Sequence, residues 1–141
     1  MWLVYAILAA AFWGLHYSIA EKLFQQVYPV TVLAIEMLFG SLLFFIFAYF
    51  SHLKIDVHTM LTQPHVLRLV IMEIIVLVIA SFFIVLSIQS KNATVAAFVE
   101  VMYPLFTIGF TWLLFHEHHL NASVLVGGAF ISVGVFIISF A

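Results

Sequence analysis

Five long apolar stretches dominate the sequence and decide what it can fold into. A helix needs about 20 mostly apolar residues to cross the hydrocarbon layer of a bilayer. Five segments meet this requirement, with charged or turn-forming residues between them: 3–20, 31–50, 67–88, 94–115 and 122–140. Strands of a membrane barrel are about 10 residues long and alternate in polarity, unlike these segments. The sequence therefore predicts an all-α integral membrane protein, a bundle of five transmembrane helices.

The composition leads to the same fold class. Of the 141 residues, 67% are hydrophobic and 7% are charged, and the mean hydropathy is +1.29. Soluble domains carry about 25% charged residues, so this chain cannot cover a surface that faces water. The length predicts a single membrane domain, residues 1–141. Cysteine and basic stretches are both lacking, so we expect neither disulfides nor a nucleic-acid partner.

The connections between the spans carry two further signals. The longest, residues 51–66, is expected to be a solvated loop. The alternative is a short interfacial helix, because Val57 and Leu61 lie among its polar residues. Asn92 and Asn121 each begin a glycosylation sequon directly before a span. At that position we expect side-chain capping of the helix N-terminus rather than glycosylation.

The charges at the two membrane faces do not define one orientation. Cytoplasmic loops normally carry the excess of Lys and Arg. Lys54 and Arg68 lie on the face of the N-terminus, and Lys22 and Lys91 lie on the other, so the count is two against two. A chain inserted in both orientations would show this tie. Six of the seven histidines lie on the first face, and their partial protonation favours the alternative, an N-terminus inside.

Four ionisable residues lie within the spans: His16, Glu36, Glu73 and Glu100. Such groups are costly in lipid and indicate function by default. At about 1.5 Å of rise per residue, the first, second and fourth lie roughly 6–9 Å from one face, and Glu73 lies about 9 Å from the other. If their helices face one another, the three form an acidic site that exchanges a proton against a cationic ligand. The alternative is structural: each glutamate is protonated and hydrogen-bonded, or reaches its interface.

The fourth span contains a proline near its middle. Pro104 removes a backbone hydrogen bond and is expected to bend the helix. Transporters place such interruptions beside their binding sites. We therefore add the neighbouring Tyr103, together with Trp13 of the first span, to the candidate substrate- and proton-binding residues His16, Glu36, Glu73 and Glu100.

Small residues recur along the last span, at Gly127, Gly128, Ser132 and Gly134. Such spacing lets membrane helices approach closely, so this span is expected to pack within or between subunits. The tract 116–119 reads His-Glu-His-His and resembles a metal site. His116 and His119 could share a helical face, but a third ligand is not apparent. We expect no metal and no other cofactor.

Taken in order, these motifs resemble the EamA family of the drug/metabolite transporter superfamily. The resemblance covers nearly the whole chain as one five-helix unit. It rests on Trp13-Gly14, Lys22, Pro29, the run AAFVEVMYP at 96–104, Glu117, Gly128 and Gly134. One departure is Glu36, which stands where the family commonly has Arg and so reverses the local charge.

The resemblance implies a membrane transporter, not an enzyme, that moves a small-molecule substrate across a bilayer. Family members usually have two such units of opposite topology, so one unit implies an antiparallel homodimer, akin to the related small multidrug resistance proteins. Those carry a carboxylate in the first helix, where this chain has His16. We place the protein in a prokaryotic cytoplasmic membrane.

We expect proton-coupled transport of a small metabolite or a cationic compound, with Glu100 as the coupling carboxylate. The alternative is a non-transporting membrane subunit or assembly factor whose carboxylates are structural. A membrane enzyme is the third possibility, but the sequence contains nothing that resembles a nucleophile–base pair.

Overall fold

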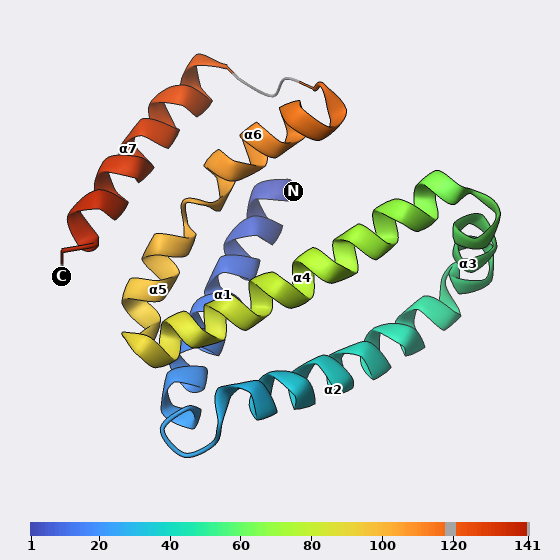
Figure 1. The fold of residues 1–141 in the computed structure, drawn as a ribbon, viewed down its shortest axis with the longest axis horizontal. Coiled ribbons are helices and arrows are strands. Elements are labelled where there is room, and N and C mark those ends of the chain that lie inside the picture. The colour runs from blue at the N-terminus through green and yellow to red at the C-terminus, as the bar shows by residue number, and fades with distance from the viewer. Residues whose placement is uncertain (118–120, 141) are drawn as a thin grey trace. The chain divides into compact units, whose positions relative to one another are not determined.

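The computed structural model describes residues 1–117 and 121–140, and this part of the chain is helical without strands. The predicted all-α class is thus confirmed. The helices appear in chain order in Figure 1: α1 (Trp2–Leu23), α2 (Pro29–Phe50), α3 (Leu53–Thr62), α4 (Pro64–Ser90), α5 (Ala93–Glu100), α6 (Tyr103–Phe115) and α7 (Ala122–Ile138).

The chain divides into two compact units. Unit 1 consists of Met1–Lys22 and Ser87–Ala141, and unit 2 consists of Leu23–Leu86. Unit 1 therefore contains α1, the end of α4, and α5 to α7. Unit 2 contains α2, α3 and most of α4. The single membrane domain over residues 1–141 remains a prediction.

Four helical stretches in the described residues are long and apolar enough to cross a membrane: Trp2–Leu23, Pro29–Phe50, Pro64–Ser90 and Ala93–Phe115. They correspond to the first four predicted spans. The fifth, α7, is apolar but has 17 residues, which gives about 25 Å of length and lies at the lower end of the spanning range. Large apolar side chains are widely exposed, for example Phe44 at 70% and Phe130 at 74%. Such surfaces suit lipid rather than water.

The connection 51–66 is not a solvated loop, so that expectation is wrong. Most of it forms α3, as the alternative proposed, and α3 packs against α2. Neither Gly nor Pro interrupts this stretch before Pro64. Proline disfavours helical geometry in the preceding residue, and Gln63 accordingly ends α3 in an extended conformation with φ −114° and ψ 99°.

The predicted side-chain caps before the fourth and fifth spans are confirmed, and in both the capping residue is the asparagine. The Asn92 side chain accepts a hydrogen bond from the Val95 amide, and Asn121 accepts one from the Val124 amide, each at 2.8 Å. These bonds satisfy amides that the first turn of a helix leaves without an internal partner.

The predicted kink at Pro104 is a full interruption of the helix. α5 ends at Glu100 and α6 begins at Tyr103, as Figure 1 shows. Pro104 has no amide proton for the Glu100 carbonyl four residues earlier, and its ring crowds that carbonyl. The Met102 amide instead donates to the Val99 carbonyl at 3.1 Å, a tighter three-residue turn.

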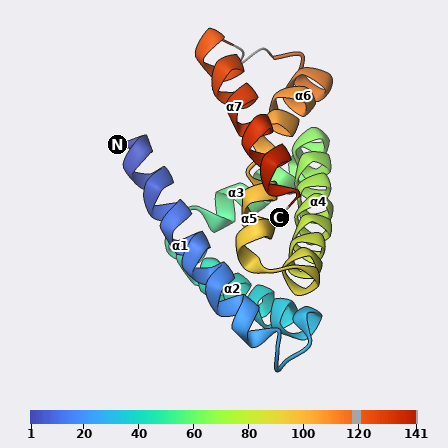
Figure 2. The same ribbon diagram turned by 90° about the vertical axis from the view of Figure 1, so that its left-hand side faces the viewer.

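The small residues of α7 divide into two groups. A Cβ atom at Gly128 would lie 2.9 Å from Leu105 Cδ2 of α6, so Gly128 serves packing inside the chain. α6 and α7 run side by side in Figures 1 and 2, and α5 also packs against α7. At Gly127 and Gly134 an added Cβ would meet no atom within 4 Å. The Ser132 hydroxyl donates to the Gly128 carbonyl at 2.9 Å.

Candidate functional site

Two polar contacts join α1 to α5 within unit 1. The Tyr17 hydroxyl donates a hydrogen bond to Glu100 Oε2, and the Ala93 amide donates to Glu21 Oε2 at 2.9 Å. Tyr17 and Glu21 are one turn apart on α1, and Ala93 and Glu100 are about two turns apart on α5, so each pair shares a face of its helix. The two contacts therefore fix both ends of one α1–α5 interface.

The Glu21 side chain stabilises the N-terminus of α5. The first amides of a helix have no internal partners, and the helix dipole favours an anion there. Glu21 supplies this anion from another helix, while Asn92 caps the Val95 amide of the same turn. Ala20 on α1 and Ala93 on α5 are 3% and 5% exposed, so the residues around this contact are small and buried.

An aromatic cluster surrounds Tyr17, which is itself 7% exposed. The ring centroids of Trp13 and His16 lie 5.6 Å from that of Tyr17, and 5.4 Å from each other. The rings of the candidates Trp13 and His16 thus contact the Tyr17 ring, and Glu100 accepts a hydrogen bond from the Tyr17 hydroxyl. Tyr17 and Glu21 are not among the site residues predicted from the sequence. The sequence feature that could have identified them is their spacing, since Trp13, Tyr17 and Glu21 follow one another at intervals of four residues and lie on one face of α1.

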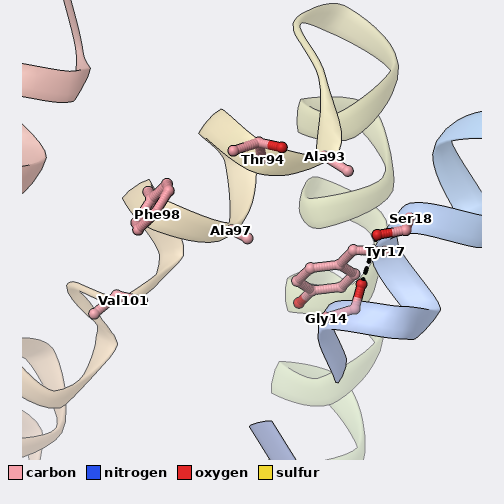
Figure 3. Close-up of a pocket in the computed structure, with 8 residues that line it drawn as sticks. All are labelled: Gly14, Tyr17, Ser18, Ala93, Thr94, Ala97, Phe98 and Val101. Atoms are coloured by element: carbon pink, nitrogen blue, oxygen red, sulfur yellow. Dashed lines mark hydrogen bonds between the residues drawn. The ribbon is translucent and has the colours of Figure 1, made fainter. Parts of the chain in front are cut away.

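A cavity of about 250 Å³ lies between α1 and α5. Figure 3 shows the Tyr17 ring reaching from α1 towards the side of α5 that carries Ala93 and Ala97. The walls are mostly small and apolar, with hydroxyl groups from a few residues. They are formed by Gly14, Tyr17, Ser18, Ala93, Thr94, Ala97, Phe98 and Val101.

The remaining candidates lie elsewhere. Tyr103 begins α6 on the far side of the helix break and is 65% exposed. Glu36 on α2 and Glu73 on α4 are exposed residues of unit 2. The expected cluster of Glu36 with His16 and Glu100 remains a prediction. A groove of about 680 Å³ between α2 and α4 has apolar walls, and neither Glu36 nor Glu73 lines it.

Residues 1–117 and 121–140 contain no group of three or more His, Asp or Glu residues placed to hold a metal ion. Of the tract considered for a metal, His118 and His119 lie outside the described residues. His116 ends α6 in the left-handed conformation, with φ 56° and ψ 27°.

Apolar helices of spanning length define an integral membrane protein, and a hydrogen bond joins the Glu100 carboxylate of the fourth span to Tyr17 of the first. The sequence model of the EamA-like transporter family matches residues 1–140. The chain belongs to this family, as its motifs suggested, and it is a membrane transporter of the drug/metabolite type with a small-molecule substrate. Searches of curated proteins and of solved structures give no significant match.

Proposed function

We propose that this transporter couples the movement of protons to that of a small metabolite or cationic compound, and that Glu100 is the coupling carboxylate. The observation that carries the proposal is the hydrogen bond from Tyr17 to Glu100 at the last residue of α5, directly before the helix break. Ionisable groups within membrane spans are characteristic of proton and substrate pathways.

A carboxylate in this position suits exchange. The bond from Tyr17 uses Oε2, and a carboxylate has further acceptor positions for a proton or a cation. Occupancy by one weakens binding of the other because each neutralises the same charge. His16, beside Tyr17, adds a second group that can carry a proton.

The helix break supplies the mobility that exchange requires. Glu100 is followed by Val101 and Met102, which join two separate helices. Discontinuous helices near a binding site recur in transporters, where the segments move around a fixed site. A purely structural role for Glu100 is the alternative, since its bond to Tyr17 also ties α1 to α5.

The proposal extends to the assembly and its membrane. We propose an antiparallel homodimer in a prokaryotic cytoplasmic membrane. The tie of two against two in Lys and Arg supports both orientations. The open space around Gly127 and Gly134 supports close approach of a helix from a partner subunit.

The test is proton flux in proteoliposomes after addition of a substrate, which is first found by thermal-shift screening across pH. Glu100→Gln keeps the size and most hydrogen bonds of Glu100 but cannot bind and release a proton. We expect normal folding and loss of flux, a milder change in affinity from Glu36→Gln, and wild-type flux from the control Asp56→Asn on α3, outside the spans. Wild-type flux from Glu100→Gln would remove Glu100 from the mechanism. The same result for Glu36 and Glu73 would leave the structural alternative.

A further inference from the structure

We infer that the cavity between α1 and α5 binds a small alkylamine, in its ammonium form, as the substrate or as the charged end of the substrate. This inference rests on the proposed function and narrows its substrate class. It follows from the direction of two hydrogen bonds, from the charge beside the cavity, and from its size.

Three residues that line the cavity carry hydroxyl groups, Tyr17, Ser18 and Thr94, and the first two have their hydroxyl protons already engaged. Ser18 donates to the Gly14 carbonyl at 2.9 Å, and Tyr17 donates to Glu100. A hydroxyl has one proton and two lone pairs. Both oxygens can therefore accept a further hydrogen bond from a ligand while these bonds remain. A ligand with N–H groups fits these two oxygens, whereas a carboxylate or phosphate would face lone pairs at both.

The charge beside the cavity also favours a cation. Tyr17 lines the cavity with its side chain and holds the carboxylate of Glu100 through its hydroxyl. Aromatic faces attract ammonium groups, more strongly where water is excluded. The cavity wall contains no Lys, Arg or His. An anionic ligand would find no opposite charge there.

The size of the cavity limits the ligand. Sites for drug-sized compounds have about 300–1,000 Å³, and this cavity has about 250 Å³. Ala97, Phe98 and Val101 give it an apolar side. These properties match a primary ammonium group on a short alkyl chain better than a bulky aromatic cation.

Tyr17 then links the ligand to Glu100. An ammonium group that donates to the Tyr17 oxygen contacts the same side chain that holds the carboxylate. Occupancy of the cavity and the position of Glu100 thus depend on one residue. Tyr17 is in this sense a positioning residue for Glu100.

The experiment is isothermal titration of the purified full chain in detergent at neutral pH with n-butylammonium, tetraethylammonium and butyrate. We expect n-butylammonium to bind at least about tenfold more tightly than tetraethylammonium, which lacks N–H donors and is bulkier; tenfold is about 1.4 kcal/mol. Butyrate should not bind. Equal binding of butyrate and n-butylammonium, or tighter binding of tetraethylammonium, would overturn the inference.

Two variants locate the binding to this cavity. An added Cβ at Gly14 meets no atom within 4 Å, so Gly14→Leu should fold and fill the cavity, which abolishes binding. Ser18→Ala removes one acceptor and should weaken binding about tenfold. The control Ser41→Ala removes a similar hydroxyl, bonded to the Leu38 carbonyl at 2.7 Å but outside the cavity. Unchanged binding in both Gly14→Leu and Ser18→Ala would refute the site.

Titration needs no transport, so the two proposals can fail separately. Amine binding at this cavity without proton flux would support the site and contradict the proposed coupling. Proton-coupled transport of another substrate, with no amine binding, would contradict the site and leave the proposed function standing.

Discussion

The Tyr17 hydroxyl of α1 donates a hydrogen bond to the Glu100 carboxylate of α5, across 83 positions of the chain. Tyr17 is 7% exposed, and a polar group in a low-dielectric site is costly without a partner. The bond therefore fixes the first span against the fourth and places the carboxylate at the helix break.

Removal of this bond should destabilise the fold. Tyr17→Phe keeps the ring contacts but leaves Glu100 without its donor, so we expect a loss of about 1–3 kcal/mol in the free energy of unfolding. The measurement is unfolding in mixed micelles with increasing sodium dodecyl sulfate. Tyr103→Phe is the matched control, because Tyr103 is 65% exposed. If Tyr17→Phe and Glu100→Leu, which removes the acceptor, are strictly additive in a double-mutant cycle, the bond does not contribute.

The contribution of Glu21 to stability should have two parts: its hydrogen bond with the Ala93 amide and the interaction of its charge with the dipole of α5. Glu21→Ala loses both and should cost about 1–2 kcal/mol. Glu21→Gln keeps an acceptor and should cost only the charge–dipole part, about 0.3–1 kcal/mol. The same unfolding assay measures both. A glutamine variant as unstable as the alanine variant would show that charge, not the hydrogen bond, dominates.

Gly128 and Gly134 should respond differently to the same substitution. Gly128→Leu forces α7 away from Leu105 and should destabilise the chain itself by about 1–3 kcal/mol, as overpacking does. Leu105→Ala in the same chain should restore part of this loss. At Gly134 an added Cβ meets no atom of the same chain within 4 Å. Gly134→Leu should therefore leave the free energy of unfolding unchanged and weaken dimerisation.

Light scattering in detergent measures this second effect. A dimer that survives Gly134→Leu and Gly127→Leu unchanged would show that α7 does not form the subunit contact.

The orientation of the chain should depend on single charges. The chain contains no cysteine, so one cysteine introduced at residue 2 or 140 reports the location of that terminus to an impermeant thiol reagent. We expect both orientations in the wild type. Lys91→Ala changes the count to two against one and should shift the population towards an N-terminus inside. A single orientation in the wild type would replace the antiparallel homodimer by a parallel assembly or another partner.

Much of the fold could be predicted because it depends on local properties of the sequence. Apolar runs define the spans, Asn92 and Asn121 cap their helices, and Pro104 interrupts the fourth span. α3 was expected to be a loop because polar residues between two spans suggest solvent. A polar composition does not prevent a helix, however, when neither Gly nor Pro interrupts it.

The site could be predicted only in part, because it depends on contacts between distant segments. His16 and Glu100 are conspicuous as ionisable groups in apolar spans. Tyr17 is neutral and common at such positions, and Glu21 resembles an ordinary charge at a membrane interface. Their importance comes from the partners they meet on α5, and one sequence without its fold does not specify these pairs.

The break between α5 and α6 has a consequence for the exchange of amide hydrogens with heavy water. In an uninterrupted membrane helix each amide is protected by its own hydrogen-bond ladder. The Met102 amide makes a three-residue bond to the Val99 carbonyl between two helix ends, so it should take up deuterium sooner than the amides in the middle of α4. Early uptake at this residue would mark the depth at which solvent enters the span, two residues after Glu100.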